Sequence, residues 1–82
     1  MNVEAIDEPI RVLAVFSGGA VEPLRFRWGR RNIRIDRVNG RWTDRGGDGH
    51  ALHYSVQAGQ ETYYLHLDVP AAQWWLDKLI VD

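Results

Sequence analysis

The sequence predicts an all-β fold, with five to six antiparallel strands in a small, strongly bent sheet or partly open barrel. Glycines recur at short intervals, apolar and polar residues alternate between them, and aromatic and β-branched residues are common in these runs. The chain of 82 residues is long enough for one domain, residues 1–82, and contains no internal repeat or linker. We therefore expect a single β domain with a thin core.

The first strand is predicted over residues 9–16, and the glycine pair at 18–19 then turns the chain. The alternate spacing of its apolar side chains places them on one face. They are Ile10, Val12, Ala14 and Phe16.

A hairpin is predicted around the two-residue loop Gly29-Arg30, because glycine in the first central position suits a tight turn between antiparallel strands. This register places Phe26 opposite Ile33 on the inner face and Arg25 opposite Arg34 on the outer face. Further inward positions are expected on both strands: Leu24 and Trp28 on the first and Ile35 on the second.

The apolar alternation changes phase after Ile35, and two interpretations fit the following residues. One is a bulge near Arg37 in a long bent strand, as small barrels use at their corners. The other is a hairpin at Asn39-Gly40, a strong turn signal. The hairpin would place Arg37 opposite Trp42, so the bent strand is favoured. Residues 43–49 are then expected to form a mobile loop.

A second hairpin is predicted from residues 50–58 and 60–68, joined by Gly59-Gln60. Residues 72–81 fit either a helical stripe or a strand, and the paired tryptophans favour a final strand, with one helical turn as an option before it. The hairpin pairs Val56 with Tyr63, Tyr54 with Leu65 and Leu52 with Leu67 inside, and Ser55 with Tyr64 and His53 with His66 outside.

Positive charge is concentrated in one stretch of the chain. Residues 23–45 hold eight arginines against two aspartates, a local balance of +6, whereas residues 1–22 sum to −3 and residues 46–82 to −4. Arginine presents a planar fork that suits phosphate, carboxylate and aromatic faces. Lysine has no such fork. One interpretation is a surface for phosphate backbone, with Trp28 available for stacking. The other is a solvated face whose arginines pair with the acidic ends of the chain.

The predicted hairpin decides which arginines would act together. Three of them share its outer face and two lie at its tip, and few carboxylates accompany them. No helix-turn-helix, zinc-finger spacing or RNA-recognition motif is present to specify a known mode of binding. The predicted nucleic-acid- or anion-binding residues are Arg25, Arg27, Arg30, Arg31 and Arg34.

Two pairs of adjacent aromatic residues form a second candidate surface. Neighbours in a strand point to opposite faces, so one member of each pair should lie outside. An outer cluster of this kind is typical of an interface for a protein partner or a homodimer. The alternative is that both faces of these strands are covered. The predicted interface residues are Tyr64, Trp74 and Trp75.

A third constellation consists of His53 and His66, paired across strands, with Asp68 on the same face and His50 in the preceding loop. Two imidazoles and a carboxylate could form an open metal site. Ordinary exposed polar residues explain the same pattern, so no metal and no cofactor is predicted.

Composition excludes several classes of protein. Without cysteine the chain forms neither disulfides nor a thiolate metal site, which is typical of cytoplasmic proteins. The N-terminal residues are acidic, unlike a signal peptide, and the longest apolar run falls far below the ~20 residues that span a membrane. No nucleophile elbow or phosphate-binding loop is present, so the protein is not predicted to be an enzyme.

Six short motifs follow one another across nearly the whole chain: Ile6–Ile10, Phe26–Arg31, Ile35–Val38 with Trp42, His53–Val56, Tyr63–Leu65 and Trp74–Leu79. In this order they resemble a small bacterial β domain of unknown function, similar to domains found alone or as C-terminal tails of Y-family translesion-polymerase-like proteins. The resemblance implies a β fold and a link to DNA transactions, and it implies no reaction. The expected function is a non-enzymatic module that binds nucleic acid or a protein handling it; the alternative is protein interaction or self-association through aromatic residues.

Overall fold

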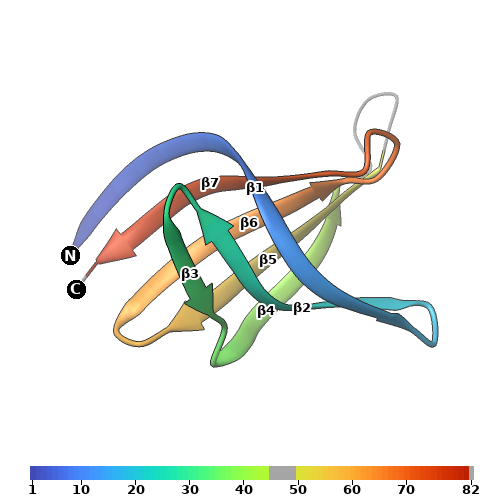
Figure 1. Ribbon diagram of the computed structural model, residues 1–82, viewed down its shortest axis with the longest axis horizontal. Helices are drawn as coiled ribbons and strands as arrows, with labels where there is room; N and C mark the ends of the chain where they lie inside the picture. Colours follow the sequence, from blue (N-terminus) through green and yellow to red (C-terminus); the bar gives the residue numbers. More distant parts are fainter. Residues whose placement is uncertain (45–49, 82) are drawn as a thin grey trace.

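The computed structural model describes residues 1–44 and 50–81 and confirms the all-β class (Figure 1). Seven strands are present rather than five or six: β1 (Asn2–Ser17), β2 (Ala20–Trp28), β3 (Arg31–Arg34), β4 (Arg37–Asp44), β5 (Ala51–Ala58), β6 (Glu61–Asp68) and β7 (Gln73–Val81). All are antiparallel neighbours in one sheet with the order β3-β2-β1-β7-β6-β5-β4. The described part of the chain contains no helix long and apolar enough to cross a membrane.

The sheet is curled because its two outermost strands, β3 and β4, are consecutive in the chain. Only Ile35 and Asp36 join them, so the two edges of the sheet must approach each other. The Ile35 N–H donates to the Leu24 carbonyl on β2 (2.9 Å), and the Asp36 N–H donates to the Gln57 carbonyl on β5 (2.8 Å). The two-residue link therefore connects opposite walls of a half-barrel, as Figure 1 shows.

The core lies inside this half-barrel, where every strand except β4 contributes buried apolar or aromatic side chains and Val38 of β4 packs against them. Phe26 on β2 meets Tyr63 on β6 edge to face, with ring centroids 5.1 Å apart. No charged side chain of the described residues is buried. The buried hydrophobic residues are Ile10, Phe26, Ile33, Tyr54, Val56, Tyr63, Leu65, Leu67, Trp74, Leu76 and Leu79.

The first strand is longer than predicted because β1 serves two neighbours. Its first half pairs with β7 and its second half with β2, so the strand bends across the molecule (Figure 1). A register shift between Ala5 and Glu8 accompanies the bend, and Asp7 there adopts φ 54°, a conformation that aspartate tolerates better than most residues. At the other end Phe16 is exposed, because the β1–β2 hairpin projects beyond the sheet.

The hairpin around Gly29-Arg30 is confirmed, with Phe26 opposite Ile33, Arg25 opposite Arg34 and Gly29 at φ 60°. One inward position is wrong. A bulge opposite Leu13 and Ala14 makes Leu24 the extra residue of β2, and its side chain is 42% exposed. Pro23 is buried in its place.

The segment after Ile35 follows neither interpretation fully. Asn39-Gly40 is no hairpin but lies within β4, and a register shift between Val38 and Gly40 makes Asn39 the bulged residue. The favoured single strand is instead divided into β3 and β4, which pair with different neighbours. Of the predicted loop, Thr43 and Asp44 belong to β4, and residues 45–49 lie outside the described residues.

The second hairpin is confirmed in every predicted pair, inside and outside. The last segment is the strand β7, as favoured, and it follows a turn in which the Ala72 N–H donates to the Val69 carbonyl (3.1 Å). Tight turns and strict alternation therefore specify this half of the sheet well.

Candidate functional site

The outer surface of the half-barrel carries two different groups of side chains. On β1, β2 and β3 lie Arg11, Arg25, Arg27 and Arg34, which we call the arginine face. On β4 to β7 lie Trp42, His53, His66 and Trp75, which we call the aromatic row. Each group takes its members from neighbouring strands, so the sheet register decides which side chains meet.

The arginine face consists of two like-charged pairs. Arg11 lies opposite Arg27 between β1 and β2, and Arg25 lies opposite Arg34 between β2 and β3. Like charges placed directly opposite each other destabilise a sheet. Arg27 also donates from Nε to the Gly29 carbonyl (3.2 Å), which holds its side chain along the turn. The sequence missed Arg11, because only the pairing of β1 with β2 places it in this group.

The two predicted tip residues have different surroundings. Arg31 has turned to the inner rim, where its guanidinium lies 5.7 Å from the Trp28 ring centroid and 4.0 Å from Glu61. Arg30 is exposed at the turn. Trp28 is not the free stacking residue that the sequence suggested, because Arg31 covers it and its Nε1 donates to Glu8 (3.2 Å).

Pairing with acidic residues accounts for some arginines and not for others. Arg41 forms an ion pair with Glu22, whose two carboxylate oxygens lie 3.0 and 2.9 Å from Arg41 Nη2. Arg31 is within ion-pair distance of Glu61. Among the described residues, no carboxylate forms a hydrogen bond or ion pair with the four members of the arginine face or with Arg30.

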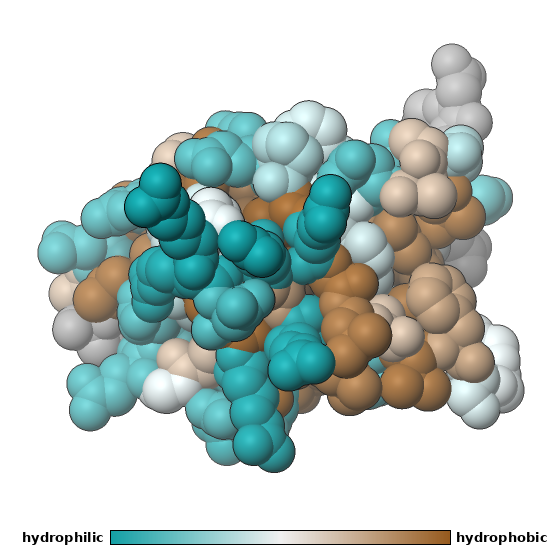
Figure 2. Space-filling view, viewed as in Figure 1, coloured by the Kyte–Doolittle hydropathy of each residue, from teal (hydrophilic) through white to brown (hydrophobic). Residues whose placement is uncertain are grey.

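Apolar side chains border the arginine face. Figure 2 shows hydrophilic residues gathered over β2 and β3, with a hydrophobic group beside them toward the β1–β2 hairpin. Leu13, Val15 and Leu24 are exposed there, and Leu13 lies directly opposite Arg25. A hollow lined by Arg11, Arg25 and Arg27 runs along this border. The surface therefore combines positive charge with apolar contact area.

The aromatic row crosses four strands, and each ring contacts the next. Trp42 stacks on His53 with centroids 5.5 Å apart and an interplanar angle of 6°. His53 lies 5.3 Å from His66, which in turn stacks on Trp75 at 6.3 Å and 10°. Trp42 begins the row and is 47% exposed. The bulge at Asn39 turns Trp42 outward, which is why the sequence did not select it.

The predicted interface residues do not all share this face. Tyr64 and Trp75 lie outside, as the alternation requires, and both are half-buried. Trp74 belongs to the core, where it is 8% exposed and packs 5.5 Å from Tyr54, so its place in the predicted interface is corrected. Tyr64 meets Trp42 edge to face at 6.3 Å.

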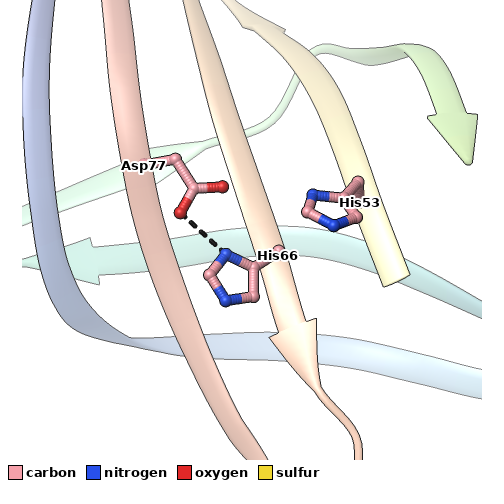
Figure 3. A group of neighbouring side chains, drawn as sticks. All are labelled: His53, His66 and Asp77. Carbon is pink, nitrogen blue, oxygen red and sulfur yellow. Dashed lines mark hydrogen bonds and ion pairs between the residues drawn. The ribbon is translucent and has the colours of Figure 1, made fainter. Parts of the chain in front are cut away.

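A small polar cluster lies in the middle of the aromatic row. His53, His66 and Asp77 project from β5, β6 and β7 on the same side of the sheet (Figure 3). His66 Nδ1 lies 2.7 Å from Asp77 Oδ1. The hypothetical third ligand considered from the sequence, Asp68, instead accepts a hydrogen bond from the Ala71 N–H at the end of the strand (3.3 Å).

A bulge explains why Asp77 was missed. The register of β7 against β6 shifts between Lys78 and Leu76, so Asp77 is the extra residue. Two successive side chains, Asp77 and Lys78, therefore reach the outer face, where Lys78 lies over the Tyr64 ring at 4.5 Å. Strict alternation predicts only one of two neighbours on each face.

Comparison of the chain with family models, curated proteins and solved structures found no match.

Proposed function

We propose that this domain is a non-enzymatic binding module that contacts nucleic acid through the arginine face. The proposal rests on one observation: two arginine pairs face each other across strands, Arg11 with Arg27 and Arg25 with Arg34. No described carboxylate neutralises them. Such an arrangement weakens the isolated sheet. An external polyanion would relieve the repulsion and gain several phosphate contacts at once.

Further features support nucleic acid as the polyanion. Arginine forms bidentate contacts with phosphate, and the exposed apolar residues beside the face offer contact area for sugar or base. The motif resemblance implies a link to DNA transactions, and a cytoplasmic location would give the domain access to DNA and RNA. A protein that handles nucleic acid is the related candidate, if it presents an acidic surface to the same arginines.

The aromatic row favours a second function, protein interaction or self-association. Trp42 is exposed at one end of the row and Tyr64 lies beside it, which together form an apolar area on the side of β4. The dependence of binding affinity on salt concentration distinguishes the two functions. Binding through phosphate contacts weakens steeply as salt rises, whereas burial of aromatic surface responds little to salt in this range.

The test is to replace Arg11, Arg25 and Arg27 with glutamine and to measure binding to single- and double-stranded DNA across salt concentrations. Each phosphate contact contributes about 0.7–0.9 to the slope of log affinity against log salt. If all three side chains contact phosphate, affinity falls and the slope flattens by about two units for single-stranded and nearly three for double-stranded DNA. Trp75→Ala should leave the slope unchanged.

The matched control replaces Arg31, Arg37 and Arg41 with glutamine, which removes the same charge from side chains that already contact Glu61, Asn39 and Glu22. We expect this control to keep most of the salt slope. Equal flattening by both triple variants would show that only net charge matters. Absence of DNA and RNA binding by the native protein at low salt would exclude the proposed function.

A further inference from the structure

We propose that His53, His66 and Asp77 bind a divalent transition-metal ion of the Zn²⁺ class on the outer face of β5, β6 and β7. One potential ligand atom from each residue lies within 4.8 Å of the others. The three residues come from three adjacent strands and project from the same side of the sheet, with His66 directed at Asp77 and His53 beside them (Figure 3). This inference is independent of nucleic-acid binding, since it concerns other residues on another part of the surface.

The distances are compatible with one ion after small side-chain adjustments. Zinc bonds imidazole nitrogen and carboxylate oxygen at about 2.0–2.2 Å, so ligand atoms of one ion lie about 3–4 Å apart. His66 Nδ1 and Asp77 Oδ1 are 2.7 Å apart in a hydrogen bond, so an ion would take the place of the shared proton and the two atoms would separate slightly. His53 offers the third ligand atom within 4.8 Å of the other two. His53 and His66 lie on β5 and β6, where they are directly paired, and Asp77 is held at the bulge of β7, so strands rather than loops carry all three residues.

The donor set suits a transition metal better than Ca²⁺ or Mg²⁺. Imidazole is a common ligand of Zn²⁺, Co²⁺ and Fe²⁺, whereas Ca²⁺ and Mg²⁺ prefer oxygen alone. Three protein ligands leave a coordination position for water or an external ligand. A hollow reaches His53 and Asp77 from the solvent side, so that position is accessible.

The surroundings contain groups that favour the ion and one that opposes it. Asp44 Oδ2 lies 3.9 Å from His53 Nε2, and a carboxylate near a ligating imidazole can orient it if the other ring nitrogen binds the ion. Asp7 lines the same hollow as Asp77. Lys78 lines it too and its positive charge opposes a cation, but its ammonium is directed over the Tyr64 ring.

Hydrogen bonding alone would explain part of this arrangement. A His66–Asp77 hydrogen bond needs no metal, and a purely structural role would make these two residues important for stability only. His53 distinguishes the possibilities. It contributes to the metal site but takes no part in the His66–Asp77 hydrogen bond, so metal affinity and metal-free stability respond differently when it is replaced.

The experiment titrates untagged, chelator-treated protein with ZnCl₂ by calorimetry and with CoCl₂ by visible absorption. We expect one ion per chain, an increase in melting temperature with Zn²⁺, and Co²⁺ bands of nitrogen and oxygen coordination. A ligand that binds only the native state must raise the melting temperature. His53→Gln, His66→Gln and Asp77→Asn should each weaken binding at least about tenfold.

The chain offers matched controls for both types of substitution. His50→Gln changes the third histidine, which is exposed outside the cluster, and Asp68→Asn changes the aspartate at the end of β6. Neither should change metal affinity. The melting temperature without metal shows whether each variant is folded, and His53→Gln still tests the site if a change at the His66–Asp77 hydrogen bond unfolds the protein. No saturable binding by native protein, or equal loss in controls and cluster variants, would overturn the proposal.

Discussion

The arginine face and the aromatic row lie on the outer surface of the same sheet, yet their side chains relate to their neighbours in opposite ways. In the aromatic row each ring contacts the next across the strands, two of the three contacts being stacked, and His66 contacts Asp77 as well. On the arginine face, each residue faces another positive charge. Cross-strand aromatic pairs stabilise a sheet by about 0.5–1.5 kcal/mol, whereas like charges in the same position destabilise it.

This difference separates two kinds of exposed surface. The side chains of the aromatic row are mostly partnered within the protein, and they stabilise the sheet whether or not a ligand is present. Among the residues that the structure describes, Arg11, Arg25 and Arg34 have no such partner, so no described contact compensates for their mutual repulsion. Partnership within the protein, rather than exposure alone, therefore indicates which surface is available for binding.

The two regions also contact each other across the half-barrel. There, side chains of β4 and β5 reach β2. The Tyr54 hydroxyl on β5 donates to the Val21 carbonyl on β2 (2.8 Å). Beside it, Arg41 on β4 pairs with Glu22 on β2 (2.9 Å). These contacts join the strands of the aromatic row to those of the arginine face.

The largest expected effect tests whether both regions depend on one core. Phe26→Ala should lower the free energy of unfolding by about 3–5 kcal/mol, because the Phe26 side chain is 2% exposed and joins β2 to Tyr63 on β6. Urea unfolding of both proteins measures the difference. Leu24→Ala is the control on the same strand and should cost less than about 1 kcal/mol, since Leu24 is exposed at a bulge. Similar losses for the two variants would contradict the structure's inner and outer faces.

A smaller effect concerns the border between the regions and depends on pH. Burial raises the pKa of Tyr54, with Arg41 lowering it and Glu22 raising it, and burial likewise raises the pKa of Tyr63. Between the ordinary tyrosine pKa of about 10 and the raised pKa, the folded protein binds more protons than the unfolded chain. The free energy of unfolding should therefore be constant with respect to these groups below about pH 10 and decrease above it.

Tyr54→Phe tests this reasoning at the border. At pH 7 the variant should lose about 0.5–1.5 kcal/mol, because the Val21 carbonyl loses its hydrogen bond. Between pH 9 and pH 11 its stability should then decrease less than that of the native protein. Identical alkaline profiles for the variant and the native protein would contradict the role of Tyr54.

The smallest expected effect is a substitution that raises the free energy of unfolding, whereas most substitutions lower it. Arg25→Glu should raise the free energy of unfolding by about 0.2–1 kcal/mol at low salt, because the new carboxylate would face Arg34. The gain should disappear in molar salt, where surface charges are screened. Arg37→Glu makes the same charge change on β4 opposite the neutral Gln57 and should not stabilise the protein. A destabilising Arg25→Glu at low salt would show that Arg25 already has a favourable partner.

Local patterns in the sequence predict much of this fold. Alternation and glycine turns place Phe26 opposite Ile33 and Val56 opposite Tyr63, and the structure has both pairs. The same patterns predict that His53 faces His66. These features depend on residues close together in the chain, where the period of a strand and the geometry of a turn leave few choices.

The candidate sites depend on features that local patterns do not contain. Arg11 joins the arginine face because β1 pairs with β2, and Asp77 joins His66 because β6 pairs with β7. Bulges at Leu24, Asn39 and Asp77 change which side chains are outside. A bulge reverses the alternation at one residue, and its position is set by the packing of the whole half-barrel.

The sequence by itself determined the all-β class, the two tight hairpins and the concentration of arginine, because each follows from residue type and short-range spacing. Only the tertiary structure decided that β3 and β4 form opposite edges joined by Ile35 and Asp36, and that the sheet must curl between them. It also decided that Trp42 lies outside and Trp74 inside. The physical reason is that strand order and bulges minimise the free energy of the whole sheet, in which contacts between distant residues outweigh local preference.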